Sequence, residues 1–82
     1  MIADYTVYIL RSLKNARHYT GITIDLERRL LEHNNGKTKS TRPHTPYEYL
    51  WTSELMTKSE ALKLEIVIKK RGAAKYLNDI DQ

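Results

Sequence analysis

The stretch Tyr19–Leu30, which reads YTGITIDLERRL, changes from a strand pattern to a helix pattern. His18–Ile22 is rich in β-branched and aromatic residues and predicts a strand. Asp25–Asn34 predicts a helix, because its leucines fall on one side at helical spacing. The Asn-Asn-Gly that follows predicts the helix end, with Gly36 supplying a left-handed backbone conformation. A strand that leads directly into a helix indicates a mixed α/β fold.

Two further strands are predicted on either side of this stretch. Tyr5–Leu10 is aromatic and β-branched, and a polar hairpin loop connects it to the next strand. Tyr47–Thr52 is the third strand, and strand alternation predicts that Tyr47, Tyr49 and Trp51 share one face. The basic, proline-containing segment 37–46 is predicted to be a loop.

The last third of the chain predicts two helices. Thr57 followed three residues later by Glu60 is a capping box, so a helix is expected to begin there and to end at Arg71. Ala73–Ile80 predicts a short additional helix. The predicted order is strand, strand, helix, strand, helix, helix, which gives a small α/β sheet with helices packed on it.

The bulk composition predicts one domain over residues 1–82. The chain has no cysteine, which suits a reducing compartment and excludes disulfides and thiolate metal sites. No apolar stretch approaches the length of a membrane span, and the N-terminus lacks a signal-peptide pattern. We therefore expect a cytoplasmic protein that has no membrane partner.

Basic residues are unevenly distributed. The formal net charge is +4, and from residue 11 to residue 42 eight basic residues stand against three acidic ones. The loop residues Lys37, Lys39 and Arg42 are candidates for contacts with DNA phosphates, and Lys69 belongs to a second basic cluster. A solvated surface explains each cluster equally well.

Glu65 is an unusual residue for its position. On a helical wheel it falls between Ala61, Leu64 and Ile68, toward the core side. An unpaired carboxylate is costly to bury, so Glu65 is expected either to form a salt bridge with Lys69 or to bind a hard divalent ion such as Mg²⁺. Spacing alone gives the two interpretations equal weight.

Arg29 and His33 lie four residues apart and share a helix face. Tyr8 lies on a predicted neighbouring strand. Phosphodiester cleavage needs a group that positions and deprotonates water, positive charge on the phosphate oxygens, and a metal near the leaving oxygen. Tyr8 or His33, Arg29 and a metal at Glu65 meet these needs.

Gly21 is expected to end its strand, where it either permits a bend or lets DNA approach the backbone.

In these motifs the chain resembles the GIY-YIG nuclease superfamily. The superfamily's two tripeptides correspond to Thr6-Val7-Tyr8 and Tyr19-Thr20-Gly21, and the resemblance covers Tyr5–Leu77. Thr6, Val7 and Thr20 depart from the superfamily's own letters. The subgroup looks like small stand-alone bacterial proteins related to the N-terminal module of the excision-repair incision subunit.

The resemblance implies a three-stranded antiparallel sheet flanked by helices, one divalent metal (Mg²⁺ or Mn²⁺) and one active site. It implies that Tyr8, with His33, is general base or water-positioner, that Tyr19 positions phosphate or water, and that Arg29 stabilises charge. It matches Glu65 to the metal-binding glutamate. Asn78 matches a position that is often asparagine.

Three functions compete at this point. The first is a metal-dependent endonuclease that hydrolyses phosphodiester bonds in DNA, in repair or processing, with a partner protein or dimerisation supplying specificity. The alternative is a DNA-binding accessory module with little catalytic activity. The third is an RNA-binding domain whose sheet exposes Tyr47, Tyr49 and Trp51 for stacking. It ranks last, because it gives no reason for Arg29 and Glu65.

Overall fold

Three antiparallel strands form one sheet in the computed structural model, which describes residues 2–81. The strands are β1 (Thr6–Ser12), β2 (His18–Thr23) and β3 (Tyr47–Thr52), and their order in the sheet is β2-β1-β3. β1 is therefore the central strand and pairs with both neighbours. The expected three-stranded antiparallel sheet is confirmed.

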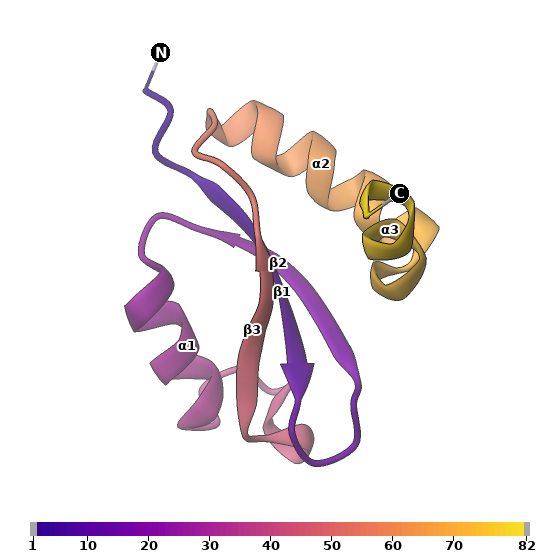
Figure 1. The fold of residues 1–82 in the computed structure, drawn as a ribbon. Coiled ribbons are helices and arrows are strands. Elements are labelled where there is room, and N and C mark those ends of the chain that lie inside the picture. Colours follow the sequence, from indigo (N-terminus) through magenta and orange to yellow (C-terminus); the bar gives the residue numbers. More distant parts are fainter. Residues whose placement is uncertain (1, 82) are drawn as a thin grey trace.

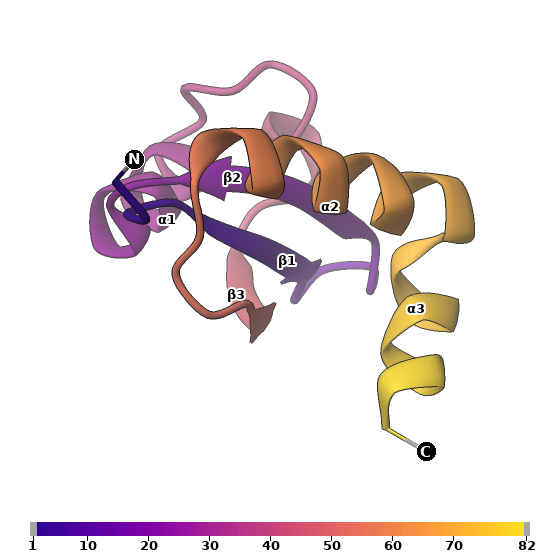
Figure 2. The ribbon, with the colours of Figure 1, turned by 90° about the horizontal axis from the view of Figure 1, so that it is seen from above.

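Helices cover both faces of the sheet. α1 (Leu26–Asn34) lies on one side, and α2 (Lys58–Arg71) and α3 (Ala73–Ile80) lie on the other (Figure 1). Figure 2 shows α2 running across β2 and α3 turning away from its end. The predicted order of strands and helices is confirmed. The structure also contains a short 3₁₀ helix, Arg42–His44, inside the expected loop.

Alternation along β1 divides the core into two clusters. Tyr8 and Leu10 are buried with Tyr47 on the α1 side, whereas Val7 and Ile9 are buried with residues of α2 on the other side. All four of these β1 side chains have no exposed surface. Successive strand side chains point to opposite faces, so one central strand anchors both helical layers.

Side-chain hydrogen bonds fix both ends of α1. At its start, Asp25 Oδ1 accepts from the backbone N–H of Arg28 at 3.0 Å, the N-cap interaction that a helix start favours. At its end, Asn34 Oδ1 accepts from Tyr47 N at 2.7 Å, and Asn34 Nδ2 donates to Tyr47 O at 3.2 Å. The amide of Asn34 thus ties α1 to the first residue of β3. Gly36 follows with φ +74°, as the predicted helix end requires.

The expected common face for the three aromatic residues of β3 is wrong. Ile9 pairs with Trp51 but Leu10 pairs with Tyr49, so β3 has an extra residue, Leu50, between them. A bulge of this kind changes the side to which the following residue points. Trp51 consequently packs on Tyr76 of α3, with ring centroids 5.7 Å apart, while Tyr49 stays on the α1 side.

Gly21 lies inside β2 and not at its end, because the strand continues to Thr23. It pairs directly with Tyr8 across the sheet. A Cβ atom at this position would lie 2.5 Å from the Tyr8 hydroxyl oxygen and 2.7 Å from the ring carbon that bears it. The close approach of the Tyr8 phenol therefore explains a glycine at this position, without a strand end or a bend.

The two remaining predicted helices agree with the structure. The Thr57–Glu60 capping box is formed, and α2 ends at Arg71 before Gly72. α3 has the predicted bounds. No helix in residues 2–81 has the length and apolar character needed to cross a membrane.

We expect Gly21→Ala to lower the free energy of unfolding by about 1–3 kcal/mol, because the new methyl group overlaps the Tyr8 ring. The same substitution in a Tyr8→Leu background should have a much smaller effect. Urea unfolding of the four proteins in this double-mutant cycle measures the difference. An equal effect in both backgrounds would show that the glycine is needed for its backbone and not for the phenol.

Candidate active site

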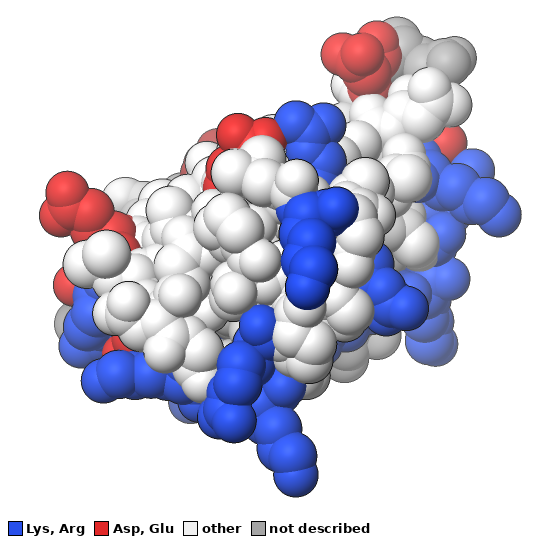
Figure 3. All heavy atoms as spheres, turned by 90° about the horizontal axis from the view of Figure 1, so that it is seen from below, with Lys and Arg blue, Asp and Glu red and all other residues white. Residues whose placement is uncertain are grey.

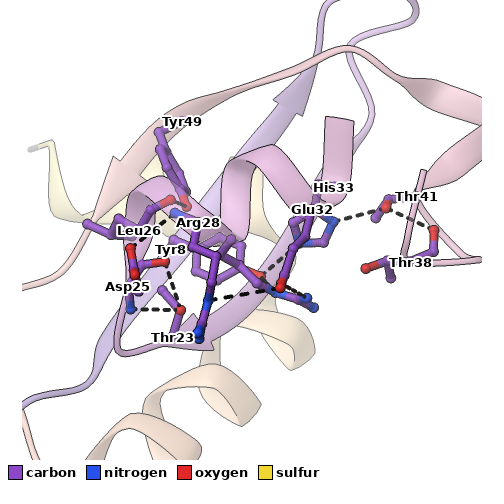
Figure 4. A network of polar contacts seen from close by, with 11 residues as sticks. Tyr8, Thr23, Asp25, Leu26, Arg28, Glu32, His33, Thr38, Thr41 and Tyr49 are labelled. Atoms are coloured by element: carbon purple, nitrogen blue, oxygen red, sulfur yellow. Dashed lines mark hydrogen bonds and ion pairs between the residues drawn. The ribbon is translucent and has the colours of Figure 1, made fainter. Parts of the chain in front are cut away.

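The Tyr8 hydroxyl is the centre of a buried polar network. Its oxygen lies 2.9 Å from His33 Nε2 and accepts a hydrogen bond from Arg29 Nε at 3.1 Å. Tyr8 comes from the central strand and the other two residues come from α1, one helical turn apart. Figure 4 shows Tyr8 and His33 between the sheet and α1. Three of the four predicted catalytic residues therefore meet at one oxygen atom.

The second ring nitrogen of His33 contacts a residue that the sequence analysis did not identify. His33 Nδ1 lies 2.9 Å from Thr41 Oγ1, and Thr41 Oγ1 donates to the Thr38 carbonyl at 3.2 Å (Figure 4). His33 has no exposed surface, and Thr41 is 1% exposed. A threonine within a polar, basic segment gives no sequence signal of burial. Its role depends on how the loop folds back over α1.

Glu32 holds the Arg29 guanidinium in place. Its carboxylate lies 3.1 Å from Arg29 Nη1 and 3.9 Å from Arg28 Nε. The Arg29 and Glu32 side chains are 29% and 32% exposed, so this pair reaches the surface beside the buried hydroxyl. Part of the Arg29 guanidinium is therefore available to an anion that approaches from solvent.

Tyr19, the fourth predicted catalytic residue, packs against this network without a hydrogen bond to it within residues 2–81. Its ring centroid lies 4.9 Å from that of His33 and 6.3 Å from that of Tyr8. Tyr47 and Tyr49 complete the aromatic surroundings, and the Tyr49 hydroxyl donates to Leu26 O at 2.6 Å. The rings pack around His33, which has no exposed surface, while the Arg29 side chain stays partly exposed.

Burial sets the protonation states of these groups. It raises the pKa of the Tyr8 hydroxyl to about 12, even though the neighbouring Arg29 acts to lower it. Burial opposes the charge on Arg29, but its contacts with Tyr8 and Glu32 outweigh this effect and raise its pKa. At neutral pH, Tyr8 is therefore a phenol and Arg29 is a cation.

Burial, together with the positive charge of Arg29, lowers the pKa of His33 to about 4. The imidazole is therefore neutral at physiological pH and has one nitrogen that can accept a proton. Positive charge from Arg29 does not lower the pKa of Tyr8 below its ordinary value. At neutral pH, Tyr8 therefore keeps its proton, and of the two groups only His33 has an unprotonated nitrogen.

Glu65 lies on α2 and has no hydrogen bond or ion pair with Tyr8, Tyr19, Arg29 or His33 within the described residues. Its side chain is 19% exposed and lies 3.4 Å from Lys69 Nζ, so the predicted salt bridge is present. α2 packs against the edge strand β2 as well as β1.

The donor set suits a hard divalent ion that has few protein ligands. Residues 2–81 contain no group of three or more His, Asp or Glu side chains that could hold a metal. Glu65 supplies a single carboxylate that is not fully buried. Mg²⁺ commonly binds through one or two carboxylates and completes its shell with water and substrate phosphate. The residues therefore fit such an ion and do not fit a metal held in a protein cage.

Of the expected DNA-binding residues, Lys37, Lys39 and Lys69 are exposed, and Arg42 also has a structural contact. Arg42 Nε donates to Gly36 O at 2.7 Å and so helps to shape the loop. Figure 3 shows the end of the molecule that carries the β1–β2 turn and this loop, with Lys and Arg side chains spread across it. Asn78 is exposed on α3, outside the Tyr8 network.

Comparisons with known proteins give one consistent result. The family model of the GIY-YIG catalytic domain matches residues 4–78. A UPF0213 protein of Natronomonas pharaonis is 42% identical over 76 residues, which cover 92% of this chain and 88% of the relative. A UPF0213 protein of Staphylococcus saprophyticus is 38% identical over 77 residues, 93% of each chain. The names of these relatives state no activity. No solved structure matches the chain.

The family model that matches most of the chain defines the class of this protein as a GIY-YIG catalytic domain. The chain belongs to the GIY-YIG family. The resemblance found in the two tripeptides is therefore confirmed, as is the similarity to small stand-alone relatives.

We expect the free energy of unfolding to fall by about 2 kcal/mol between about pH 7.5 and about pH 5 because of His33. The folded pKa, about 4, is below the unfolded value of 6.5, so below pH 6.5 the unfolded chain binds the proton first. The His33 contribution is therefore complete at neutral pH and is lost as the pH falls toward 4.

Urea unfolding at the two pH values tests this expectation. His33→Gln should remove this part of the pH dependence, whereas His18→Gln, at an exposed position of β2, should leave it unchanged. An undiminished fall of stability in His33→Gln would assign the effect to other groups.

Proposed function

We propose that this chain is a metal-dependent endonuclease that hydrolyses phosphodiester bonds in DNA and acts in DNA repair or processing. The observation that carries the proposal is the Tyr8 hydroxyl oxygen, which contacts both Arg29 Nε and His33 Nε2. The hydroxyl thus joins a cation, which phosphodiester hydrolysis needs for the phosphate charge, to a neutral ring nitrogen, which it needs for the proton that water loses.

These three side chains meet the needs of phosphodiester hydrolysis. Tyr8 positions a water molecule, and the proton that this water loses ends on neutral His33. The water oxygen bonds to phosphorus, and the leaving oxygen takes the electron pair of the broken P–O bond. Arg29, which stays charged and is partly exposed, stabilises the negative charge that develops on the phosphate oxygens. Tyr19, whose ring packs on that of His33, would position the phosphate or the water.

Glu65 would hold one Mg²⁺ or Mn²⁺ ion, with DNA phosphate and water as the other ligands. When bound, the ion supplies a Lewis acid for the phosphate and charge stabilisation for the leaving oxygen. Lys69, at present 3.4 Å from Glu65, would give up this ion pair and become free to contact a phosphate.

Exposed basic residues near the site would hold the DNA backbone. Lys37 and Lys39 lie in the segment that also carries Thr41, the partner of His33, so a phosphate contact there is close to the catalytic network. Contacts of this type position a duplex without reading its sequence. Specificity would then come from DNA shape, from a partner protein or from dimerisation.

The alternative functions differ in how the structure supports them. A DNA-binding accessory module with little activity would use the same exposed lysines, and a cleavage assay separates it from an enzyme. The RNA-binding hypothesis loses its basis, because the sheet aromatics do not form one exposed face. Tyr47 is only 5% exposed, and Trp51 packs on Tyr76.

We expect the purified protein to nick supercoiled plasmid DNA in the presence of Mg²⁺ or Mn²⁺, and chelation to stop the reaction. Tyr8→Phe and Arg29→Ala should each lower the rate by about a hundredfold, since each removes one transition-state donor or proton carrier. Glu65→Gln should abolish metal-dependent cleavage while the protein stays folded. Circular dichroism checks the fold of each variant.

Lys69→Met is the matched control for Glu65→Gln, because it breaks the same ion pair and keeps the carboxylate. It should retain metal-dependent cleavage at saturating DNA, while its affinity for DNA falls through the lost phosphate contact. If both substitutions reduce stability alike and the wild type binds no metal in a titration, the salt bridge is the better account of Glu65. DNA binding by the wild type without any cleavage would support the accessory module.

Neutralising Lys37 and Lys39 together, by substitution to Gln, should weaken DNA binding to a similar extent for every sequence. The slope of log affinity against log salt should fall by about two units, about one for each lost phosphate contact. Arg42 is left intact because it also shapes the loop. Lys58→Gln with Lys63→Gln, two exposed lysines of α2, gives the same change in net charge as a control. Equal slopes for the two double variants would show that the loop does not contact the substrate.

A further inference from the structure

His33 has a different partner at each of its ring nitrogens. Nε2 lies 2.9 Å from the Tyr8 hydroxyl oxygen, and Nδ1 lies 2.9 Å from Thr41 Oγ1. His33 and Tyr8 have no exposed surface, and Thr41 is 1% exposed, so these contacts are made away from bulk water. A neutral imidazole has one N–H donor and one acceptor nitrogen. The partners must therefore determine which nitrogen carries the proton.

The hydrogen bonds of the Thr41 hydroxyl group indicate where the imidazole proton lies. The Thr41 hydroxyl has one proton, and Oγ1 lies 3.2 Å from the Thr38 carbonyl oxygen, which can only accept. When the hydroxyl donates to Thr38 O, a carbonyl that also accepts from the backbone N–H groups of Thr41 and Arg42, it accepts from His33. This arrangement places the imidazole proton on Nδ1.

The contacts of the Tyr8 hydroxyl also favour an imidazole proton on Nδ1. Arg29 Nε can only donate, and it already donates to the Tyr8 oxygen at 3.1 Å. If His33 Nε2 also carried a proton, the Tyr8 oxygen would receive two N–H donors, and the phenol proton would have no acceptor within residues 2–81. With Nε2 unprotonated, the phenol donates to it and every group in the network has a partner. Buried polar groups are normally satisfied in this way, and the described residues contain no unsatisfied buried side-chain atom.

We propose that Thr41 is a positioning residue that holds neutral His33 in the Nδ1–H tautomer and thereby keeps the Nε2 lone pair on Tyr8. The hydrogen bonds then run in one direction, from Arg29 to Tyr8, from Tyr8 to His33, from His33 to Thr41, and from Thr41 to the Thr38 carbonyl. The other tautomer would leave Tyr8 without a proton acceptor.

The catalytic consequence rests on the proposed function. As a water molecule transfers a proton to the Tyr8 oxygen, Tyr8 transfers its own proton to His33 Nε2. The net change is one proton moved from water to the imidazole, and Tyr8 ends as a phenol again. The imidazolium that forms keeps its Nδ1–H bond to Thr41. Tyr8 can thus serve in this transfer even though its own pKa is too high for it to lose a proton permanently.

The tautomer can be measured on the protein without DNA and without metal. Two-bond ¹H–¹⁵N correlation spectra of ¹⁵N-labelled protein at neutral pH distinguish a protonated ring nitrogen from an unprotonated one. We expect His33 of the wild type to show a protonated Nδ1 and an unprotonated Nε2. Thr41→Ser keeps the hydroxyl and should preserve this pattern. Thr41→Val is nearly isosteric and removes the acceptor of the Nδ1–H, so the fraction of His33 with its proton on Nε2 should rise.

Thr45→Val is the matched control. Its hydroxyl also donates to a backbone carbonyl of the same segment, Arg42 O at 3.3 Å, but it has no contact with His33. The spectrum of His33 should therefore be unchanged in this variant. In a cleavage assay, Thr41→Val should lower kcat by about tenfold or more with little change in KM, Thr41→Ser should restore it, and Thr45→Val should have no effect.

A wild-type spectrum with the proton on Nε2 would overturn the proposal, whether or not any variant folds. So would an unchanged His33 tautomer in folded Thr41→Val. Because the spectra need no substrate, an absence of nuclease activity would leave the tautomer result intact and would count against the proposed function alone. Normal cleavage combined with an Nε2–H tautomer would reject the role of Thr41 and leave the proposed function standing.

Discussion

The position of the Tyr8 phenol is the constraint on which the rest of this structure depends. The ring crosses the neighbouring strand over Gly21, in space that any side chain there would fill. Only this path brings the hydroxyl to α1, where Arg29 and His33 meet it. The central strand therefore contributes to the hydrophobic core and to the polar network through the same residue. α1 must then be held at a fixed distance from the sheet. The hydrogen bonds between Asp25 and Thr23 of β2 and between Asn34 and Tyr47 of β3 achieve this at its two ends.

Burial also determines the protonation states of Tyr8 and His33. The same desolvation raises the pKa of Tyr8 and lowers that of His33, so both groups are neutral at physiological pH. Arg29 alone remains charged, since its contacts with Tyr8 and Glu32 compensate for the burial. A cation beside a neutral donor–acceptor pair can attract a phosphate and still leave a base free to accept a proton. A charged histidine in the same place would repel Arg29 and could accept nothing.

The two sides of the sheet have separate tasks. The α1 side carries the Tyr8 network, and the other side is an apolar cluster in which α2 buries Ala61 and Ile68 against β1. Glu65 lies on α2, which also packs against the edge strand β2. The ion pair of Glu65 with Lys69 shows that local spacing can explain this carboxylate by itself. The ion pair needs only helical spacing, whereas the grouping of Tyr8, Arg29 and His33 needs the sheet and α1 together.

The sequence alone determined those features that depend on neighbours in the chain. The Thr57–Glu60 capping box and the left-handed Gly36 were predicted correctly, because capping and backbone conformation are settled within a few residues. The four-residue spacing of Arg29 and His33 likewise placed both on one helix face. Trp51 was assigned to the wrong face, because a bulge arises only from pairing with another strand. The burial of Thr41 was missed altogether, because a threonine in a polar loop becomes a partner of His33 only when the tertiary structure folds that loop over α1.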